Sequence, residues 1–226
     1  MCWRMGGGMC NVKLMEKQSA PAKLSLAIIA ILTWFAVIAQ FCININSGAE
    51  SYSLLILRFF DYFTITTNIT VAVTCTIIFL KQGNGWGKFF SKQQTLTAVT
   101  VYILVVGLIY NLILRVLWKP EGLQMIVNEL LHSVIPVLFL LYWLVFAPKD
   151  QLKWKNAWSW LLYPLVYTIY VFIFGAITGF YPYPFVDLTQ LGPGKTLINV
   201  AGVAILFLAF SYLLIAIAKF LSRKNA

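Results

Sequence analysis

The sequence predicts an all-α membrane protein with six transmembrane helices. Of its 226 residues, 61% are hydrophobic and only 11% are charged, whereas soluble domains are about half apolar and a quarter charged. The apolar residues form continuous runs of about 20 residues or more, the length that a helix needs to cross a bilayer core roughly 30 Å thick. The runs do not alternate with a period of two, which argues against membrane-spanning strands.

Six apolar runs define the expected spans. They are, in chain order, Leu24–Ile45, Leu57–Leu80, Thr95–Trp118, Met125–Ala147, Trp158–Phe180 and Leu197–Leu221. One membrane domain therefore covers residues 24–221, between a tail of residues 1–23 and a short tail of residues 222–226. The first run, with about 22 residues, is too long for the apolar core of a signal peptide, which predicts a retained span. The four cysteines show neither metal-ligand spacing nor a disulfide framework, so we expect no metal site.

The basic residues predict how the six spans are oriented. Thirteen of the 17 lysines and arginines lie on the side that carries both termini, and only Arg58, Arg115, Lys119 and Lys195 lie on the other side. Loops rich in lysine and arginine stay in the cytoplasm. The pattern predicts that both termini are cytoplasmic, and it attributes the net charge of +10 to membrane topology rather than to nucleic-acid binding.

Polar residues interrupt the second expected span, Leu57–Leu80. Arg58, Asp61, Thr64 and Asn68 follow one another at steps of three or four residues, so on one continuous helix they share a face. Such a face is costly in lipid unless it is turned toward the bundle interior or toward water. A structural ion pair between Arg58 and Asp61 is the other interpretation, and both remain open.

The fourth expected span contains the only histidine of the chain, His132. Asn128 and Glu129 precede it by four and three residues, so both are expected on its helical face. Pro136 follows it by four residues and lacks the amide that would bond the carbonyl group of His132, which predicts a kink. Arg115, near the outer end of the third span, is expected to snorkel or to pair with one of the acidic side chains on this side.

The remaining spans contain less chemistry. In the first, Gln40 is interpreted as a packing residue, and the sixth is expected to serve mainly for packing. The fifth ends in Gly175–Gly179, a GxxxG spacing typical of close helix packing. It runs into the aromatic segment 180–187, which either anchors the protein at the membrane interface or roofs a cavity open to the outer leaflet. Tyr181 in this segment is a candidate substrate-binding residue.

Thr64 and His132 are expected at the same depth in the membrane. Each lies about seven residues from the outer end of its span, which is roughly 10 Å at the rise of an α-helix. On neighbouring helices, a hydroxyl and an imidazole at one level supply a nucleophile and its base. The residues around them could orient the base or hold an oxyanion: Asp61, Asn68, Asn128 and Glu129. A site within the leaflet suits an ester whose acyl chains already lie in the membrane.

Three segments, Phe60–Ile69, Leu130–Val137 and Gly175–Phe185, resemble a bacterial branch of the androgen-induced transmembrane protein family. This family includes the androgen-dependent regulator of tissue factor pathway inhibitor. The resemblance extends from the first span to the last. It implies six helices, cytoplasmic termini and a location in the bacterial inner membrane. It also implies a cofactor-free hydrolase that cleaves fatty acid esters of hydroxy fatty acids or similar membrane lipids.

The same resemblance implies which residues carry the reaction. His132 becomes the base, and Thr64 becomes the nucleophile, with Thr66 and Thr67 as alternatives that a small shift in alignment would select. The expected mechanism is attack by the threonine hydroxyl on the ester carbonyl, with Asn68 or Asn128 holding the oxyanion. Asp61 or Glu129 would hold the imidazole in the required tautomer.

Three other functions remain open from the sequence. A transporter would use the outer-side charges and His132 as an ion or proton path, although no charged residue continues inward through the spans and no inverted repeat is present. A haem protein would have to bind its iron with one histidine per chain. A structural or binding protein would keep His132 as a satisfied residue of the core.

Overall fold

The computed structural model describes residues 19–46, 51–80 and 85–224. Within these residues every regular element is a helix. The Gly-rich start of the N-terminal tail, Cys2 and Cys10 lie outside the described residues. The elements are α1 (Ala20–Asn46), α2 (Tyr52–Asp61), α3 (Phe63–Leu80), α4 (Gly85–Phe90), α5 (Gln93–Ile109), η1 (Tyr110–Leu114), α6 (Gly122–Glu129), η2 (Leu130–Val134), α7 (Ile135–Phe146), α8 (Asn156–Trp160), α9 (Leu162–Thr178), η3 (Pro184–Val186) and α10 (Leu188–Lys224).

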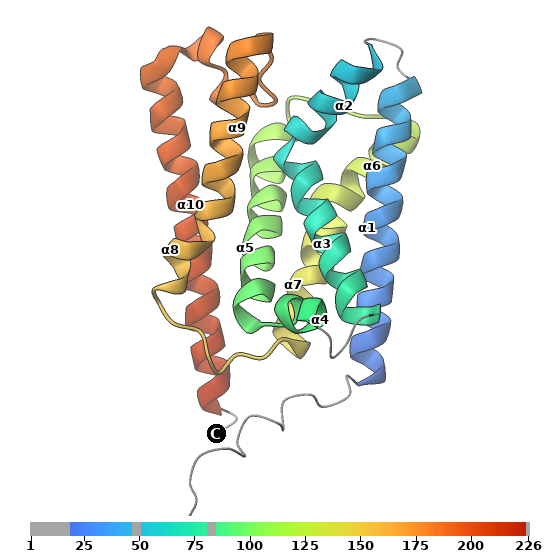
Figure 1. Ribbon diagram of the computed structural model, residues 1–226, viewed down its shortest axis with the longest axis vertical. Helices are drawn as coiled ribbons and strands as arrows, with labels where there is room; N and C mark the ends of the chain where they lie inside the picture. The colour runs from blue at the N-terminus through green and yellow to red at the C-terminus, as the bar shows by residue number, and fades with distance from the viewer. Residues whose placement is uncertain (1–18, 47–50, 81–84, 225–226) are drawn as a thin grey trace, which may run out of the picture.

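Six helical stretches in the described part of the chain are long and apolar enough to cross a membrane, which confirms the predicted number of spans. Three of the stretches combine consecutive elements: α5 with η1, α6 with η2 and α7, and α8 with α9. The helices lie side by side in one bundle, with α5 between the α9–α10 pair and the helices α3 and α1 (Figure 1). The start of α1 and the end of α10 lie at the same end of the bundle, and α2 lies at the opposite end.

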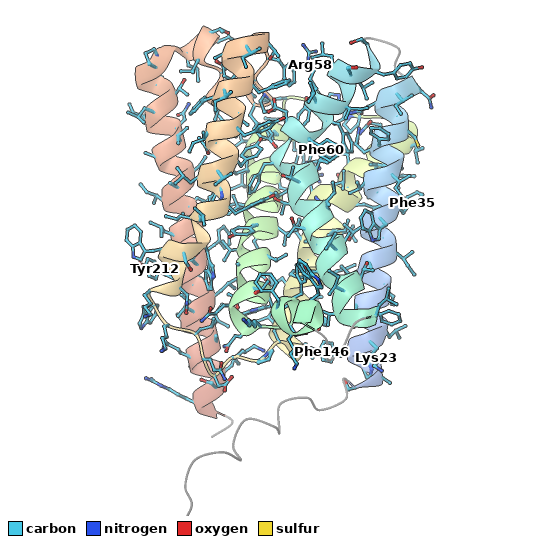
Figure 2. All side chains as sticks on the ribbon, viewed as in Figure 1. Lys23, Phe35, Arg58, Phe60, Phe146 and Tyr212 are labelled. Carbon is cyan, nitrogen blue, oxygen red and sulfur yellow. The ribbon has the colours of Figure 1, made fainter. Side chains whose placement is uncertain are left out.

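The outer surface of the bundle is apolar, as a lipid-facing surface must be. Phe35 on α1 points away from the neighbouring helices and is 49% exposed (Figure 2). Lys23 lies at the end of the bundle where the described chain begins and ends, and Arg58 lies at the other end. The buried residues pack between α1, α3, α5 and α7, so these four helices form the core that positions the site.

The second expected span is not one helix, and this part of the prediction is wrong. Tyr62 has an extended backbone (φ −84°, ψ 120°) that separates α2 from α3. The phenol of Tyr167 on α9 takes over the hydrogen bonds that the break removes. It accepts one from the backbone N–H of Phe63 at 3.0 Å and donates one to the carbonyl of Asp61 at 2.6 Å. Buried backbone groups need such partners, so the break depends on a side chain about 100 residues away.

The spans that carry Tyr110 and His132 loosen into short π-helices, η1 and η2, which contact each other. Single π-helical turns inside α-helices are frequent at functional sites. The carbonyl of His132, which the proline at 136 leaves without its amide, accepts a hydrogen bond from Asn111 Nδ2 at 3.1 Å. Gly107 lets the two spans approach, because a Cβ there would lie 3.1 Å from that carbonyl oxygen and 3.2 Å from Pro136 Cβ.

The aromatic segment after α9 folds back onto the helix that precedes it. The ring of Tyr181 occupies the space next to Gly175, where an added Cβ would lie only 2.2 Å from a ring carbon. Gly175 therefore packs against a side chain of its own following segment rather than against another helix. Gly179 ends α9 in the left-handed conformation (φ 71°), which suits glycine at this position.

Asp187 then begins the last helix. Its carboxylate accepts hydrogen bonds from Thr189 and Gln190, and these bonds hold its pKa below the usual value. Gly192 interrupts the helical conformation after the first turn of α10.

Candidate functional site

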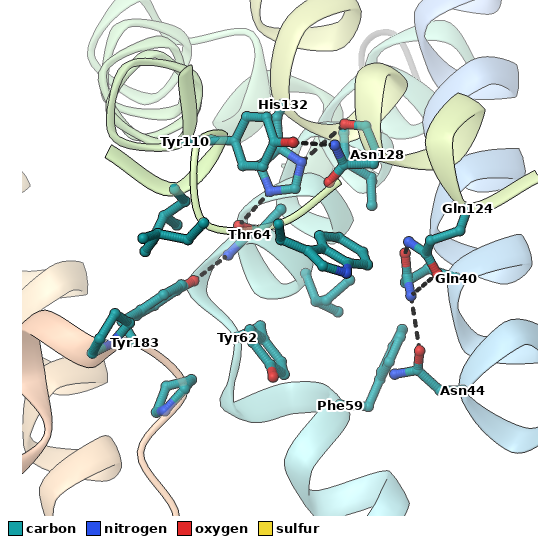
Figure 3. Close-up of a pocket in the computed structure, with 17 residues that line it drawn as sticks. Gln40, Asn44, Phe59, Tyr62, Thr64, Tyr110, Gln124, Asn128, His132 and Tyr183 are labelled. Atoms are coloured by element: carbon teal, nitrogen blue, oxygen red, sulfur yellow. Dashed lines mark hydrogen bonds between the residues drawn. The ribbon is translucent and has the colours of Figure 1, made fainter. Parts of the chain in front are cut away.

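The structure brings Thr64 and His132 together, which confirms the predicted contact between their helices. Thr64 lies in the first turn of α3 and His132 in η2, and Thr64 Oγ1 is 3.3 Å from His132 Nε2 (Figure 3). Thr64 is buried and His132 is half-buried. Thr66 and Thr67, the alternatives, point elsewhere: Thr66 donates to the carbonyl of Phe63, and the hydroxyl of Thr67 is buried without a hydrogen-bond partner among the described residues.

A backbone carbonyl orients the imidazole. His132 Nδ1 lies 2.9 Å from the carbonyl oxygen of Asn128, which can only accept a hydrogen bond. In a neutral imidazole Nδ1 must then carry the proton, and Nε2 is left as the acceptor that faces the hydroxyl of Thr64. We expected Asp61 or Glu129 to hold the tautomer, and this expectation is wrong. The turn of helix that bears the histidine supplies the acceptor itself.

Tyr110 holds the imidazole from the side, a role that is not predicted from the sequence. Its ring stacks on the ring of His132 with centroids 4.0 Å apart and planes 25° apart. The side-chain amide of Asn128 donates a hydrogen bond to the Tyr110 hydroxyl. Asn128 therefore acts twice, through its carbonyl on the imidazole and through its amide on the phenol that stacks against it.

A second tyrosine contacts the backbone of Thr64. The hydroxyl of Tyr183 lies 3.4 Å from the backbone N–H of Thr64, one of the N–H groups that the start of α3 leaves without a helical partner. Burial raises the pKa of Tyr183 to about 12, so the phenol stays protonated at neutral pH. Tyr181 is the candidate predicted from this segment, but its ring packs on Gly175, and the hydroxyl of Tyr183 contacts Thr64 instead.

Asn68 joins the two helices that carry Thr64 and His132. Its Nδ2 donates to the carbonyl of Thr64 at 2.8 Å and to the carbonyl of Leu131 at 3.3 Å. Both amide hydrogens of Asn68 are used in these bonds, whereas the bond to Tyr110 uses one of the two amide hydrogens of Asn128. Asn68, one of the two amides expected to hold an oxyanion, is therefore engaged in holding the helices of Thr64 and His132 together.

Glu129 and Arg115 form an ion pair on the outside of the site. Their closest N–O distance is 2.6 Å, and the side chains are 40% and 43% exposed. Arg115 also donates to Ser133 Oγ at 3.1 Å. Arg115 is thus paired, as expected, but neither member of the pair lines the cavity around Thr64.

Asp61 is buried at the break between α2 and α3, away from the imidazole. Its side chain is fully buried, and neither carboxylate oxygen has a hydrogen-bond partner among the described residues. Burial raises the pKa of Asp61 to about 6, and the positive charge of Arg58 opposes part of this effect. Because Tyr62 breaks the helix, the expected face shared with Thr64 and Asn68 does not form.

Thr64 and His132 line a cavity of about 550 Å³ (Figure 3). Four amide side chains line the cavity: Gln40, Asn44, Gln124 and Asn128. Of these, Gln40 is predicted from the sequence to be a packing residue. Gln40 exchanges hydrogen bonds with Gln124 at 2.7 and 3.2 Å, which joins α1 to α6. The position of Gln40 in the cavity could not be predicted, because a single amide in a hydrophobic span does not show which way its side chain points.

Ligands for a metal ion are not grouped in this cavity. Within residues 19–46, 51–80 and 85–224, no cluster of three or more His, Cys, Asp or Glu side chains could hold one. The hydroxyl, imidazole, phenols and amides form a set suited to nucleophilic attack and proton transfer.

Comparisons of the chain with models of protein families, with curated proteins and with solved structures found no match. The geometry of Thr64, His132 and their neighbours therefore carries the functional argument.

Proposed function

We propose that this chain is an intramembrane lipid ester hydrolase in which Thr64 is the nucleophile and His132 is its base. One observation carries the proposal. The acceptor nitrogen of the only histidine faces the Thr64 hydroxyl at 3.3 Å, while the carbonyl of Asn128 holds the other ring nitrogen. Catalytic hydrogen bonds are often long before substrate binds, so this distance suits a free enzyme.

The proposed reaction has two stages. His132 Nε2 removes the proton of Thr64 as Oγ1 attacks the ester carbonyl, and the imidazolium then gives this proton to the leaving alcohol. The product is an acyl ester on Thr64. A water molecule, deprotonated by His132, attacks this ester, releases the fatty acid and restores the threonine.

Tyr110 is the proposed donor to the oxyanion. Its oxygen already accepts a hydrogen bond from the amide of Asn128, so its own proton is free to point into the cavity that it lines. A donor that is polarised by a second hydrogen bond gives a stronger one. Tyr183 lines the same cavity and is the second candidate donor.

The proposed orientation places the site in the outer leaflet of a bacterial plasma membrane. Lys88, Lys92, Lys149, Lys153 and Lys155 lie in connections on the side of the chain termini, and Thr64 lies near the opposite ends of the spans. The excess of lysine favours a cytoplasmic location for the terminal side. The substrate, a lipid ester such as a fatty acid ester of a hydroxy fatty acid, would then enter from the outer leaflet.

Covalent labelling with a fluorophosphonate probe tests the proposal. We expect the purified protein to label, and we expect Thr64→Ala and His132→Ala to reduce the rate by about 10³-fold or more. We expect Tyr110→Phe, which keeps the stacked ring, to reduce it by about 10²-fold. Thr70→Ala is the matched control, because the Thr70 hydroxyl only donates to the carbonyl of Thr66 one turn back. Undiminished labelling of Thr64→Ala would overturn the proposal.

A further inference from the structure

A second cavity, of about 230 Å³, lies on the other side of Thr64. Its walls come from α3, α5, α9 and α10, with Val106, Leu165, Ala204 and Phe207 among the residues that line it. The first cavity lies instead toward α1 and α6. The reactive hydroxyl therefore has a cavity on each side.

The two cavities meet at the reactive group. Thr64, Tyr110, Leu114 and Tyr183 line both of them. An ester carbonyl carbon has two substituents, the acyl chain and the alkoxy group, and they leave it in different directions. When Thr64 Oγ1 attacks this carbon at the junction of the cavities, each cavity can receive one substituent.

The linings of the two cavities differ in chemistry. Among the described residues, no amide and no charged side chain lines the second cavity. Its polar groups outside the shared residues are already engaged: Thr168 donates to the carbonyl of Pro164, and Tyr167 donates to that of Asp61. Such a lining favours methylene groups, since a polar substituent would lose its hydrogen bonds to water and find no partner. The first cavity is lined instead by four amide side chains, which hydrogen-bond to one another and to Tyr110 and still present polar atoms to the cavity.

The second cavity also reaches the lipid-facing surface of the bundle. Leu165 lines it and is at the same time 55% exposed on α9. Its volume is below the roughly 300 Å³ at which sites for drug-sized ligands begin. One extended chain that enters sideways from the membrane suits these dimensions better than a bulky group.

We propose that the second cavity is the acyl-chain site, and that it selects which lipid esters are cleaved. This inference rests on the proposed hydrolase function. The fatty acyl chain lies between α5, α9 and α10, and the alcohol part of the substrate lies among the amides of the first cavity. After acylation the chain stays in the second cavity on Thr64, the alcohol leaves from the first, and water enters where the amides can bind it.

The test compares alkyl fluorophosphonates with a short and a long alkyl chain. Thr64 Oγ1 forms a bond to phosphorus, the P–F bond breaks, fluoride leaves, and His132 takes the hydroxyl proton. In the unaltered protein, each buried methylene should raise the labelling rate by up to about fourfold until the cavity is full. We expect Ala204→Trp, which fills the cavity, to lower the ratio of long-chain to short-chain rates at least tenfold.

Two further variants make the test specific. Ile205→Trp is the matched control, because Ile205 is the next residue on α10, is 65% exposed and does not line the cavity. It should keep the ratio of the unaltered protein. Phe207→Leu enlarges the cavity and should shift the preferred chain length upward.

The outcomes separate this inference from the function on which it rests. Equal ratios in Ala204→Trp, Ile205→Trp and the unaltered protein, together with an unshifted preference in Phe207→Leu, would overturn the acyl-chain site and leave the hydrolase intact. Absence of labelling by both probes in the unaltered protein would overturn both. Loss of chain selectivity in Ile205→Trp as well would show a general effect on the bundle and would also count against the site.

Discussion

Two different irregularities in membrane helices position Thr64 and His132, the proposed nucleophile and its proposed base. Thr64 follows a complete break, at which the phenols of Tyr167 and Tyr183 replace the missing helical hydrogen bonds. His132 lies in a continuous span that loosens into a π-helix, and its imidazole is held by the carbonyl of Asn128 one turn earlier. The position of Thr64 therefore depends on residues far away in the chain, whereas the orientation of the His132 imidazole is largely local.

This difference predicts that the break is the more fragile of the two. Tyr167→Phe removes the partner of the Phe63 N–H and of the Asp61 carbonyl together. Because buried backbone groups without partners cost about 1–3 kcal/mol each, we expect a loss of about 2–4 kcal/mol in the free energy of unfolding and a large drop in probe labelling. Denaturant unfolding in detergent micelles measures the first, and labelling rates measure the second.

Tyr163→Phe is the matched control, since this hydroxyl on the same helix is buried without a hydrogen-bond partner among the described residues. Its removal should leave stability unchanged or slightly increased. Equal losses in the two variants would show that the Tyr167 hydroxyl has no special role at the break.

A substitution of Gly107 tests the π-helical region that carries His132. In Gly107→Ala the new methyl group would lie 3.1 Å from the carbonyl oxygen of His132 and 3.2 Å from Pro136 Cβ, so the two spans must move apart. We expect a loss of about 1–3 kcal/mol in the free energy of unfolding. Labelling should slow as well, because the displaced carbonyl belongs to the base. Gly202→Ala meets no atom within 4 Å and should be neutral or stabilising by up to about 1 kcal/mol.

The carboxylate at the break predicts a pH dependence of stability. Asp61 has a pKa of 3.8 in a free carboxyl and about 6 in the folded protein. The folded state therefore binds the proton more tightly, so this contribution to stability is complete below about pH 4 and is lost as the pH rises through about 6.

The expected size is about 1–3 kcal/mol, the upper value being what this gap in pKa represents. Unfolding midpoints measured from pH 4 to pH 7 should fall in the unaltered protein. They should fall less in Asp61→Asn. An equal dependence of the unfolding midpoint on pH in the two proteins would contradict a buried carboxylate at the break.

The smallest effect is expected at the ion pair beside the π-helix. Glu129→Gln removes the charge from a pair whose side chains are about 40% exposed, so stability should change by less than about 1 kcal/mol. Labelling should stay within about twofold, because the carbonyl of Asn128, and not this carboxylate, orients His132. A large loss of labelling would instead support the role predicted for Glu129 from the sequence, which is to hold the tautomer of His132.

Several features could be predicted from the sequence because each depends on a short stretch of chain. The length of apolar runs determined six spans, since the bilayer thickness sets how many residues a helix needs to cross it. Counting residues from the span ends placed Thr64 and His132 at one depth, and they do meet. The position of Pro136 left the carbonyl of His132 in need of a partner, which Asn111 provides.

The remaining features were decided by tertiary structure. A continuous apolar run hides the break at Tyr62, because the phenols that stabilise it come from residues more than 100 positions later. Tyr181 and Tyr183 are equivalent by composition, and only the packing of one ring on Gly175 turns the other toward Thr64. Spacing alone cannot distinguish such cases, since hydrogen-bond partners are chosen by which helices touch and not by order along the chain.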